Sequence, residues 1–234
     1  MRKYADLHVC LTDLNNDVLT RTGGYAKEMG FHLLGIVTPD PLEQNQISAI
    51  KKTLMATGVD VATRIDITPK DRNHLFSQLR SVRKRFEIVA VQCTSPHIAR
   101  IACRDRRVDI VSFPIMNRYA RFQSRIASLC RASIEINIAQ IISPGNTPRH
   151  WILSKLTDQV TTAKTSNVPI ILSSGATNPL MLRAPREMAA IGSLLGLETP
   201  EALDSVSKTP FKIIEQNRSR LSPDHVAVGV KLER

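Results

Sequence analysis

The chain has 234 residues, of which 42% are hydrophobic, and a formal net charge of +11 at pH 7. This composition excludes a disordered protein, and no apolar run approaches the roughly 20 residues that a membrane-spanning helix needs. The length suits one α/β barrel or two small domains.

Short apolar runs rich in β-branched residues alternate with helix-like stretches along most of the chain. Strands are expected at residues 4–11, 31–37, 59–67, 86–93, 108–113, 133–138 and 168–173. Helices are expected at residues 15–30, 42–57, 70–85, 96–104, 118–131, 148–166 and 185–195, and two more should begin at Thr199 and Thr209. This regular alternation is typical of right-handed βαβ units in a parallel sheet.

No glycine-rich dinucleotide turn follows the first strand, so a closed barrel is favoured over an open sheet. We therefore predict an α/β fold, a TIM-barrel-like (β/α) barrel of about seven parallel strands with extra C-terminal helices. A single barrel domain should cover residues 1–216, and the basic residues 217–234 should form a flexible C-terminal tail. Four widely spaced cysteines and the lack of a secretory signal favour a cytoplasmic protein without membrane contact.

The positive charge is concentrated in the middle of the chain. Residues 70–131 hold 14 Lys and Arg against four Asp and Glu, a net of +10 out of +11. Twelve of the 14 are arginines, whose planar guanidinium groups suit phosphate oxygens. Because dense charge of one sign repels itself unless a polyanion offsets it, nucleic-acid binding is the favoured interpretation.

Residues 168–197 predict a buried strand, a loop of small residues and a helix that begins at Pro185. The loop Ser173-Ser174-Gly175 should let a ligand approach the backbone, and Arg183 and Arg186 lie at the helix start. Backbone N–H groups and guanidinium groups at a helix N-terminus form a phosphate site. The local pattern leaves open whether the phosphate belongs to a metabolite or to a nucleic acid.

Function in a parallel barrel is located at the C-terminal ends of the strands. The candidates there are His8, Cys10, Asp66, Cys93, His97 and Glu135. The run Asp6-Leu7-His8-Val9-Cys10 resembles the first metal motif, D-x-H-x-H, of the polymerase-and-histidinol-phosphatase (PHP) superfamily, with cysteine in place of the second histidine. A metal site needs several converging ligands, which six scattered histidines do not supply, so we expect His8 to be a hydrogen-bonded barrel residue and no metal or cofactor to be held by the protein.

Only 4% of the residues are aromatic, so phosphate and shape recognition by arginines is favoured over base stacking. The expected RNA-binding residues follow strand ends or a helix end: Arg100, Arg104, Arg107, Arg118, Arg121, Arg183 and Arg186. Asn117 and the loop Ser173-Ser174-Gly175 should lie near the RNA.

Three segments together carry a family resemblance: R-V-D-I-V-S-F-P-I-M-N-R, the run from I-L-S-S-G-A-T-N-P to L-L-G-L, and P-E-A-L-D-S-V-S. They resemble ribonuclease P protein component 3, and the likeness runs from about residue 1 to residue 215. The resemblance implies a PHP-like barrel without the metal centre. It also implies a non-catalytic subunit that pairs with component 2, as a heterodimer or heterotetramer, and binds ribonuclease P RNA and precursor tRNA.

The same resemblance implies that the catalytic RNA removes the 5′ leader of precursor tRNA with its own Mg²⁺, and that Arg118 and Arg183 belong to the RNA-contacting face. Two alternatives stay open. A metal-dependent phosphoesterase of the PHP type would explain Asp6 and His8 but not Cys10. A barrel enzyme for a small phosphorylated substrate would explain the loop at residues 173–176 but not the charge at residues 70–131.

Overall fold

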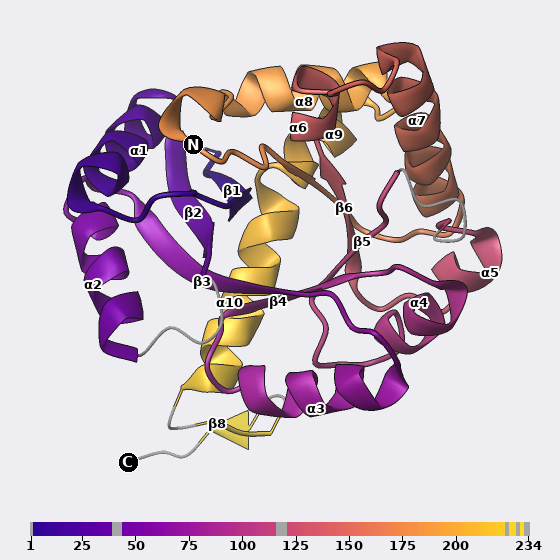
Figure 1. Ribbon diagram of the computed structural model, residues 1–234, viewed down its shortest axis with the longest axis horizontal. Coiled ribbons are helices and arrows are strands. Elements are labelled where there is room, and N and C mark those ends of the chain that lie inside the picture. Colours follow the sequence, from indigo (N-terminus) through magenta and orange to yellow (C-terminus); the bar gives the residue numbers. More distant parts are fainter. Residues whose placement is uncertain (1, 39–43, 116–120, 223–224, 228–229, 232–234) are drawn as a thin grey trace.

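A computed structural model describes residues 2–38, 44–115, 121–222, 225–227 and 230–231. Figure 1 shows strands at the centre of the molecule with helices around them. The strands are β1 (Tyr4–Val9), β2 (Phe31–Val37), β3 (Asp60–Ile67), β4 (Ile88–Gln92), β5 (Ile110–Ser112), β6 (Ser133–Asn137) and β7 (Ile170–Ser173). They pair in parallel in the order β1 to β7, which confirms the predicted seven-stranded barrel.

The predicted helices lie close to observed ones, with one exception, and the short helix at Ala139–Ile142 was not predicted. The observed helices are α1 (Asn16–Glu28), α2 (Gln44–Met55), α3 (Arg72–Val82), α4 (Pro96–Ala102), α5 (Ser124–Ala127), α6 (Ala139–Ile142), α7 (Arg149–Thr165), α8 (Pro185–Leu194), α9 (Thr199–Ser205) and α10 (Lys208–Leu221), with a 3₁₀ turn, η1, at Pro179–Met181. The long helix expected at residues 118–131 is wrong, since helix covers only Ser124–Ala127 of its described part. Residues 121–123 are not helical, and Phe122 is buried against Phe113 with ring centroids 5.0 Å apart.

The barrel is nearly closed between β7 and β1 without a continuous ladder. A single parallel bridge joins Val9 to Ala176, where the Cys10 N–H donates to the Ala176 carbonyl at 2.8 Å. Below this bridge, the Ser174 N–H donates to the buried carboxylate of Asp6 at 3.2 Å. The first strand and the loop after the last strand are thus tied by both backbone and side-chain contacts.

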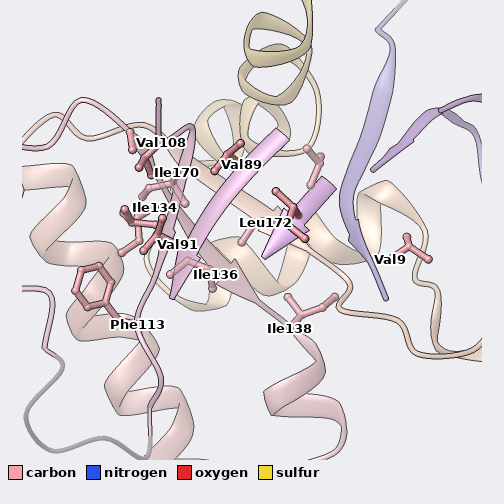
Figure 2. Packing of buried hydrophobic residues seen from close by; sticks show 14 of the residues in the cluster. Val9, Val89, Val91, Val108, Phe113, Ile134, Ile136, Ile138, Ile170 and Leu172 are labelled. Carbon is pink, nitrogen blue, oxygen red and sulfur yellow. The ribbon is translucent and has the colours of Figure 1, made fainter. Parts of the chain in front are cut away.

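Two apolar layers hold the barrel together. The larger layer lies between the strands and the surrounding helices, and Figure 2 shows side chains of β4, β6 and β7 gathered in it, among them Val91, Ile136 and Leu172. The smaller layer fills the barrel interior and includes Leu33, Ile88, Ile110 and Ile171. Ile214 of α10 packs into this interior layer, so α10 closes the end of the barrel at which the strands begin.

The last turn of α10 is anchored and extends past residue 216, after which the tail was expected to begin. Asn217 is buried and its side-chain amide donates to the Glu87 carbonyl at 2.8 Å. Arg218 pairs with Asp60 and Glu87, each at 2.6 Å. These partners lie at the starts of β3 and β4, so Asn217 and Arg218 are packed against the barrel. A short antiparallel pair, β8 (His225–Ala227) with β9 (Val230–Lys231), follows.

Candidate functional site

The C-terminal end of the barrel holds a network of charged side chains around Arg64. Arg64 is fully buried, and its guanidinium donates to both carboxylate oxygens of Glu135 at 2.6 and 2.7 Å. It also donates to both oxygens of Asp66 at 2.6 and 3.3 Å and to the Leu7 carbonyl at 2.9 Å. All five N–H groups of the guanidinium are therefore used inside the protein.

His8 completes this network. Its Nδ1 lies 3.1 Å from the nearer oxygen of Glu135, and its Nε2 lies 3.7 Å from Asp66. The structure thus brings together three of the predicted strand-end residues, His8, Asp66 and Glu135, and His8 is hydrogen-bonded as expected. Arg64 was missed, although an arginine among the apolar residues of a predicted strand is itself a signal of an internal ion pair.

The other strand-end candidates lie outside the network. Cys93 is buried in the apolar layer behind β4, and burial raises its pKa, so it is an apolar packing group. His97 is exposed in the first turn of α4. Among the residues that the structure describes, no three His, Cys, Asp or Glu side chains are arranged to hold a metal ion.

The charges of the network alter one another's ionisation. Burial raises the pKa of Glu135, but Arg64 and His8 more than offset it and hold the pKa well below its usual range. Burial likewise lowers the pKa of Arg64, and the attraction of Asp66 and Glu135 outweighs it and raises that pKa further. At neutral pH the buried pair of Glu135 and Arg64 is therefore ionised on both sides.

This ion pair predicts a loss of stability in acid. Because the pKa of Glu135 is lower in the folded chain, its ionised form stabilises the fold above the unfolded value of about 4.3, and this contribution is lost as the pH falls through the folded pKa. Urea unfolding between pH 7 and pH 3 should show the loss. Glu135→Gln should be less stable at pH 7 and should show a shallower decline below pH 5. Parallel curves of unfolding free energy against pH for the native protein and Glu135→Gln would contradict the lowered pKa of Glu135.

The loop at residues 173–175 does not form the expected ligand site. Ser173, Ser174 and Gly175 are all buried, so the loop is not open as expected, and its position near RNA stays a prediction. Gly175 has φ +62°, and a Cβ there would collide with the side chain of Asn137. Glycine is needed because the loop turns tightly into the barrel, where it closes β7 against β1.

The start of α8 is also occupied by protein groups. The Glu187 carboxylate accepts from the Ala184 N–H at 3.2 Å, which places a negative charge where a phosphate was expected. Arg183 donates to the carbonyls of Leu180 and Leu182 at 3.0 and 2.7 Å, so its guanidinium partly stabilises the turn before the helix. Arg186 is exposed on the first turn of α8.

The predicted RNA-binding residues are divided between opposite ends of the barrel. Arg121, Arg183 and Arg186 follow β5 and β7 and lie at the C-terminal end, whereas Arg118 and Asn117 lie outside the described residues. Arg100, Arg104 and Arg107 lie on α4 or between it and β5, toward the N-terminal end. Arg107 is held by Asp105 at 2.9 and 2.6 Å and stacks over Phe76, so its charge is compensated.

A basic groove lies at the N-terminal end, between α10 and the starts of β5, β6 and β7. We call it the basal groove; it has a volume of about 490 Å³ and is lined by Arg106, Val108, Asp109, Arg131, Ser133, Pro169, Thr209, Lys212, Ile213, Gln216 and Arg220. Its four cationic residues are exposed, and within the described part of the chain Arg106, Arg131 and Lys212 have no carboxylate partner. Arg104 adjoins it through a second hollow that shares Arg131.

Sequence reasoning named Arg104 but missed the groove itself. Arg106 and Arg131 are separated in the sequence by β5 and α5. Lys212 and Arg220 belong to α10, whose position under the barrel no local pattern reveals. The available signal was the position of Arg106 and Arg131 immediately before two predicted strands, which places both at the same end of a parallel barrel.

Comparisons with known proteins agree with this fold. Residues 3–222 match the model of the family described as RNase P subunit p30. The chain belongs to this family. Ribonuclease P protein component 3 of Methanosarcina barkeri is 27% identical over 98% of this chain and 95% of its own length, and that of Methanococcoides burtonii is 25% identical over 99% and 94%.

The fold of this ribonuclease P subunit also matches a solved relative. A chain in a structure of archaeal ribonuclease P with mature tRNA superimposes with a TM-score of 0.83 at 20% sequence identity, covering 97% of both chains. The family match extends through α10, the helix that closes the barrel. The comparisons do not support the phosphoesterase alternative better than the family assignment, and the Arg64 network occupies the end of the barrel at which its metal centre would lie.

Proposed function

We propose that this ribonuclease P subunit binds RNA through the basal groove. The observation that carries the proposal is the set of three exposed cations, Arg106, Arg131 and Lys212, that share one groove and lack carboxylate partners in the described residues. Cations held together in this way repel one another unless an anion lies between them. A phosphate backbone supplies such anions at regular spacing.

The chemistry of the groove favours backbone phosphates over bases. Its walls contain no aromatic side chain, so bases have no stacking surface there. Arg106, Arg131 and Arg220 supply planar guanidinium groups that can donate two hydrogen bonds to one phosphate. Sequence-independent binding of this kind suits a protein that holds a folded RNA in place.

The proposed role within ribonuclease P follows from this binding mode. The subunit neutralises phosphates of the catalytic RNA, helps it hold an active fold, and so assists removal of the 5′ leader from precursor tRNA with Mg²⁺ held by the RNA. The names of the relatives and the tRNA in the matched complex support this role. Pairing with ribonuclease P protein component 2 and a cytoplasmic location are part of the same proposal.

Reconstitution of precursor-tRNA cleavage tests the role directly. Adding this protein to ribonuclease P RNA and the remaining protein subunits should increase the rate of 5′-leader removal at limiting Mg²⁺, because neutralised phosphates lower the demand for cations. An unrelated basic protein of similar net charge serves as the control for non-specific screening. Equal cleavage with and without the subunit, or equal stimulation by the control protein, would contradict the proposal.

A further inference from the structure

We propose that Cys103 and Cys130 form a reversible redox pair, in which the Cys130 sulfur reacts with a peroxide and Cys103 then closes a disulfide with it. Cys103 is the last residue of the α4 turn, and Cys130 follows α5, so both lie toward the N-terminal end of the barrel. The inference concerns thiol chemistry and does not rest on the proposed RNA binding.

The fold holds the two cysteines side by side although α5 and β5 separate them in the sequence. The Arg131 N–H donates to the Cys103 carbonyl at 2.8 Å, which fixes the two backbones next to each other. The Cys130 sulfur lies 3.4 Å from the Ala132 carbonyl oxygen, and the Cys103 thiol donates a hydrogen bond to that sulfur. Two cysteines whose backbones are adjacent and whose sulfurs touch can form a disulfide with little backbone movement.

The two thiols differ in their access to solvent. Cys103 is fully buried, whereas Cys130 is half-buried and lines a hollow of about 410 Å³ together with Arg104 and Arg131. Both arginines are exposed and have no carboxylate partner among the residues that the structure describes. A peroxide from solvent therefore reaches Cys130 first, and the two guanidinium groups can stabilise the negative charge on the departing oxygen.

The ionisation of the pair has the same asymmetry. The hydrogen bond from Cys103 lowers the pKa of Cys130, and although burial opposes this effect, a backbone hydrogen bond at Ala132 lowers the pKa further. The same contact with Cys130 raises the pKa of Cys103, and burial raises it further. Since the thiolate is the nucleophile, Cys130 is the attacking sulfur and Cys103 is the thiol that resolves the product.

The reaction has two steps. The Cys130 thiolate attacks one oxygen of the peroxide, the O–O bond breaks, hydroxide leaves and takes a proton from solvent, and Cys130 becomes a sulfenic acid. The Cys103 sulfur then attacks the Cys130 sulfur, the S–O bond breaks, and the Cys103 proton leaves with the hydroxyl as water. Two thiols and one hydrogen peroxide thus give one disulfide and two waters. A thiol reductant reverses the bond, as expected for a disulfide in a reducing compartment.

The other two cysteines serve as internal controls. Cys10 is also half-buried, but burial and the nearby Asp66 raise its pKa. Cys93 lies close enough to Cys130 for the two to interact, but it is fully buried in the apolar layer behind β4 and its pKa is raised. Cys130 alone among the four cysteines combines access to solvent with a lowered pKa.

Alkylation of the reduced native protein tests the state of each thiol. Iodoacetamide is added near pH 7 after removal of the reductant, and mass spectrometry of proteolytic peptides gives the labelling rate of each cysteine. Cys130 should be alkylated at least about ten-fold faster than Cys10, because only the thiolate reacts. Cys93 and Cys103 should remain unlabelled over the same time. Equal rates at Cys10 and Cys130 would overturn the proposal.

Treatment with hydrogen peroxide tests the pairing. The native protein and Cys93→Ala should form a disulfide between Cys103 and Cys130, and dithiothreitol should remove it. In Cys103→Ser the sulfenic acid at Cys130 should accumulate and be trapped by dimedone, whereas Cys130→Ser should give neither product. A disulfide between any other two cysteines of the native protein, or equal dimedone labelling of Cys130 in the native protein and in Cys103→Ser, would refute the pair. The disulfide map of the native protein decides the pairing even if a variant does not fold.

Discussion

Replacing Arg106, Arg131 and Lys212 by glutamine should weaken binding to ribonuclease P RNA more than any other triple substitution of exposed cations. If each side chain neutralises one phosphate, the negative slope of log affinity against log salt concentration should become shallower by roughly two to three. The affinity near 0.1 M salt should fall on the order of a hundred-fold. Filter binding or fluorescence titration at several salt concentrations measures both quantities. The three side chains are exposed and form no ion pair with described residues, so the fold should be unaffected.

A matched triple at the other end of the barrel discriminates between the two RNA faces. Arg121, Arg183 and Arg186 were expected from the sequence to contact RNA, and their replacement by glutamine removes the same charge from the C-terminal end. We expect this triple to leave the salt slope nearly unchanged, because Arg183 is engaged with backbone carbonyls and Glu187 opposes an anion at the start of α8. A larger loss for this triple, or no change for the basal triple, would refute the basal groove as the RNA site.

Replacing Arg64 by methionine should destabilise the protein by about 3–5 kcal/mol, because Glu135 would be left buried and charged without its partner. Urea unfolding at pH 7 measures the change in the free energy of unfolding. The exposed pair of Arg21 with Asp17 supplies the control, and Arg21→Met should cost at most about 0.5 kcal/mol. The large difference between two arginine substitutions would come from burial alone.

A double substitution separates the charge effect from packing. Arg64→Met/Glu135→Gln removes the unpaired charge as well as the guanidinium, and it should recover much of the stability lost in Arg64→Met. Equal instability of the single and double variants would mean that shape, and not charge, dominates at this position. Stability of Arg64→Met within 1 kcal/mol of the native protein would contradict the buried ion pair altogether.

The strands were predictable because each is a local pattern. The range 31–37 agrees with β2 at both ends, and Asp60–Ile67 and Ser133–Asn137 differ from their predictions by one residue at one end. Proline and glycine at element boundaries, such as Pro185 and Gly196, act through their own backbone geometry and need no tertiary partner. The helix predicted at residues 118–131 was too long in its described part, where Phe122 packs on Phe113 instead of following the helical pattern.

Site residues were harder to predict because exposure and pairing are not local properties. Arg104, Arg106 and Arg107 are nearly adjacent in sequence, yet Arg107 is held by Asp105 and Phe76 whereas Arg104 and Arg106 are exposed. Ser173 and Ser174 have the composition of an open loop and are buried because they close the barrel. Only the positions of neighbouring elements separate these cases.

The sequence by itself determined the order of seven strands and the helices between them, the concentration of arginine in the middle of the chain and the family resemblance. These properties depend only on residue types and on their spacing along the chain. Both act through local conformational preference and composition, without a tertiary partner. Only the tertiary structure decided that Arg64 meets Glu135 across 71 residues, that the loop at residues 173–175 is internal, and that Lys212 joins Arg106 and Arg131 in one groove. Barrel closure brings these distant residues together, and the burial that results fixes which charges are paired and which remain open to a phosphate.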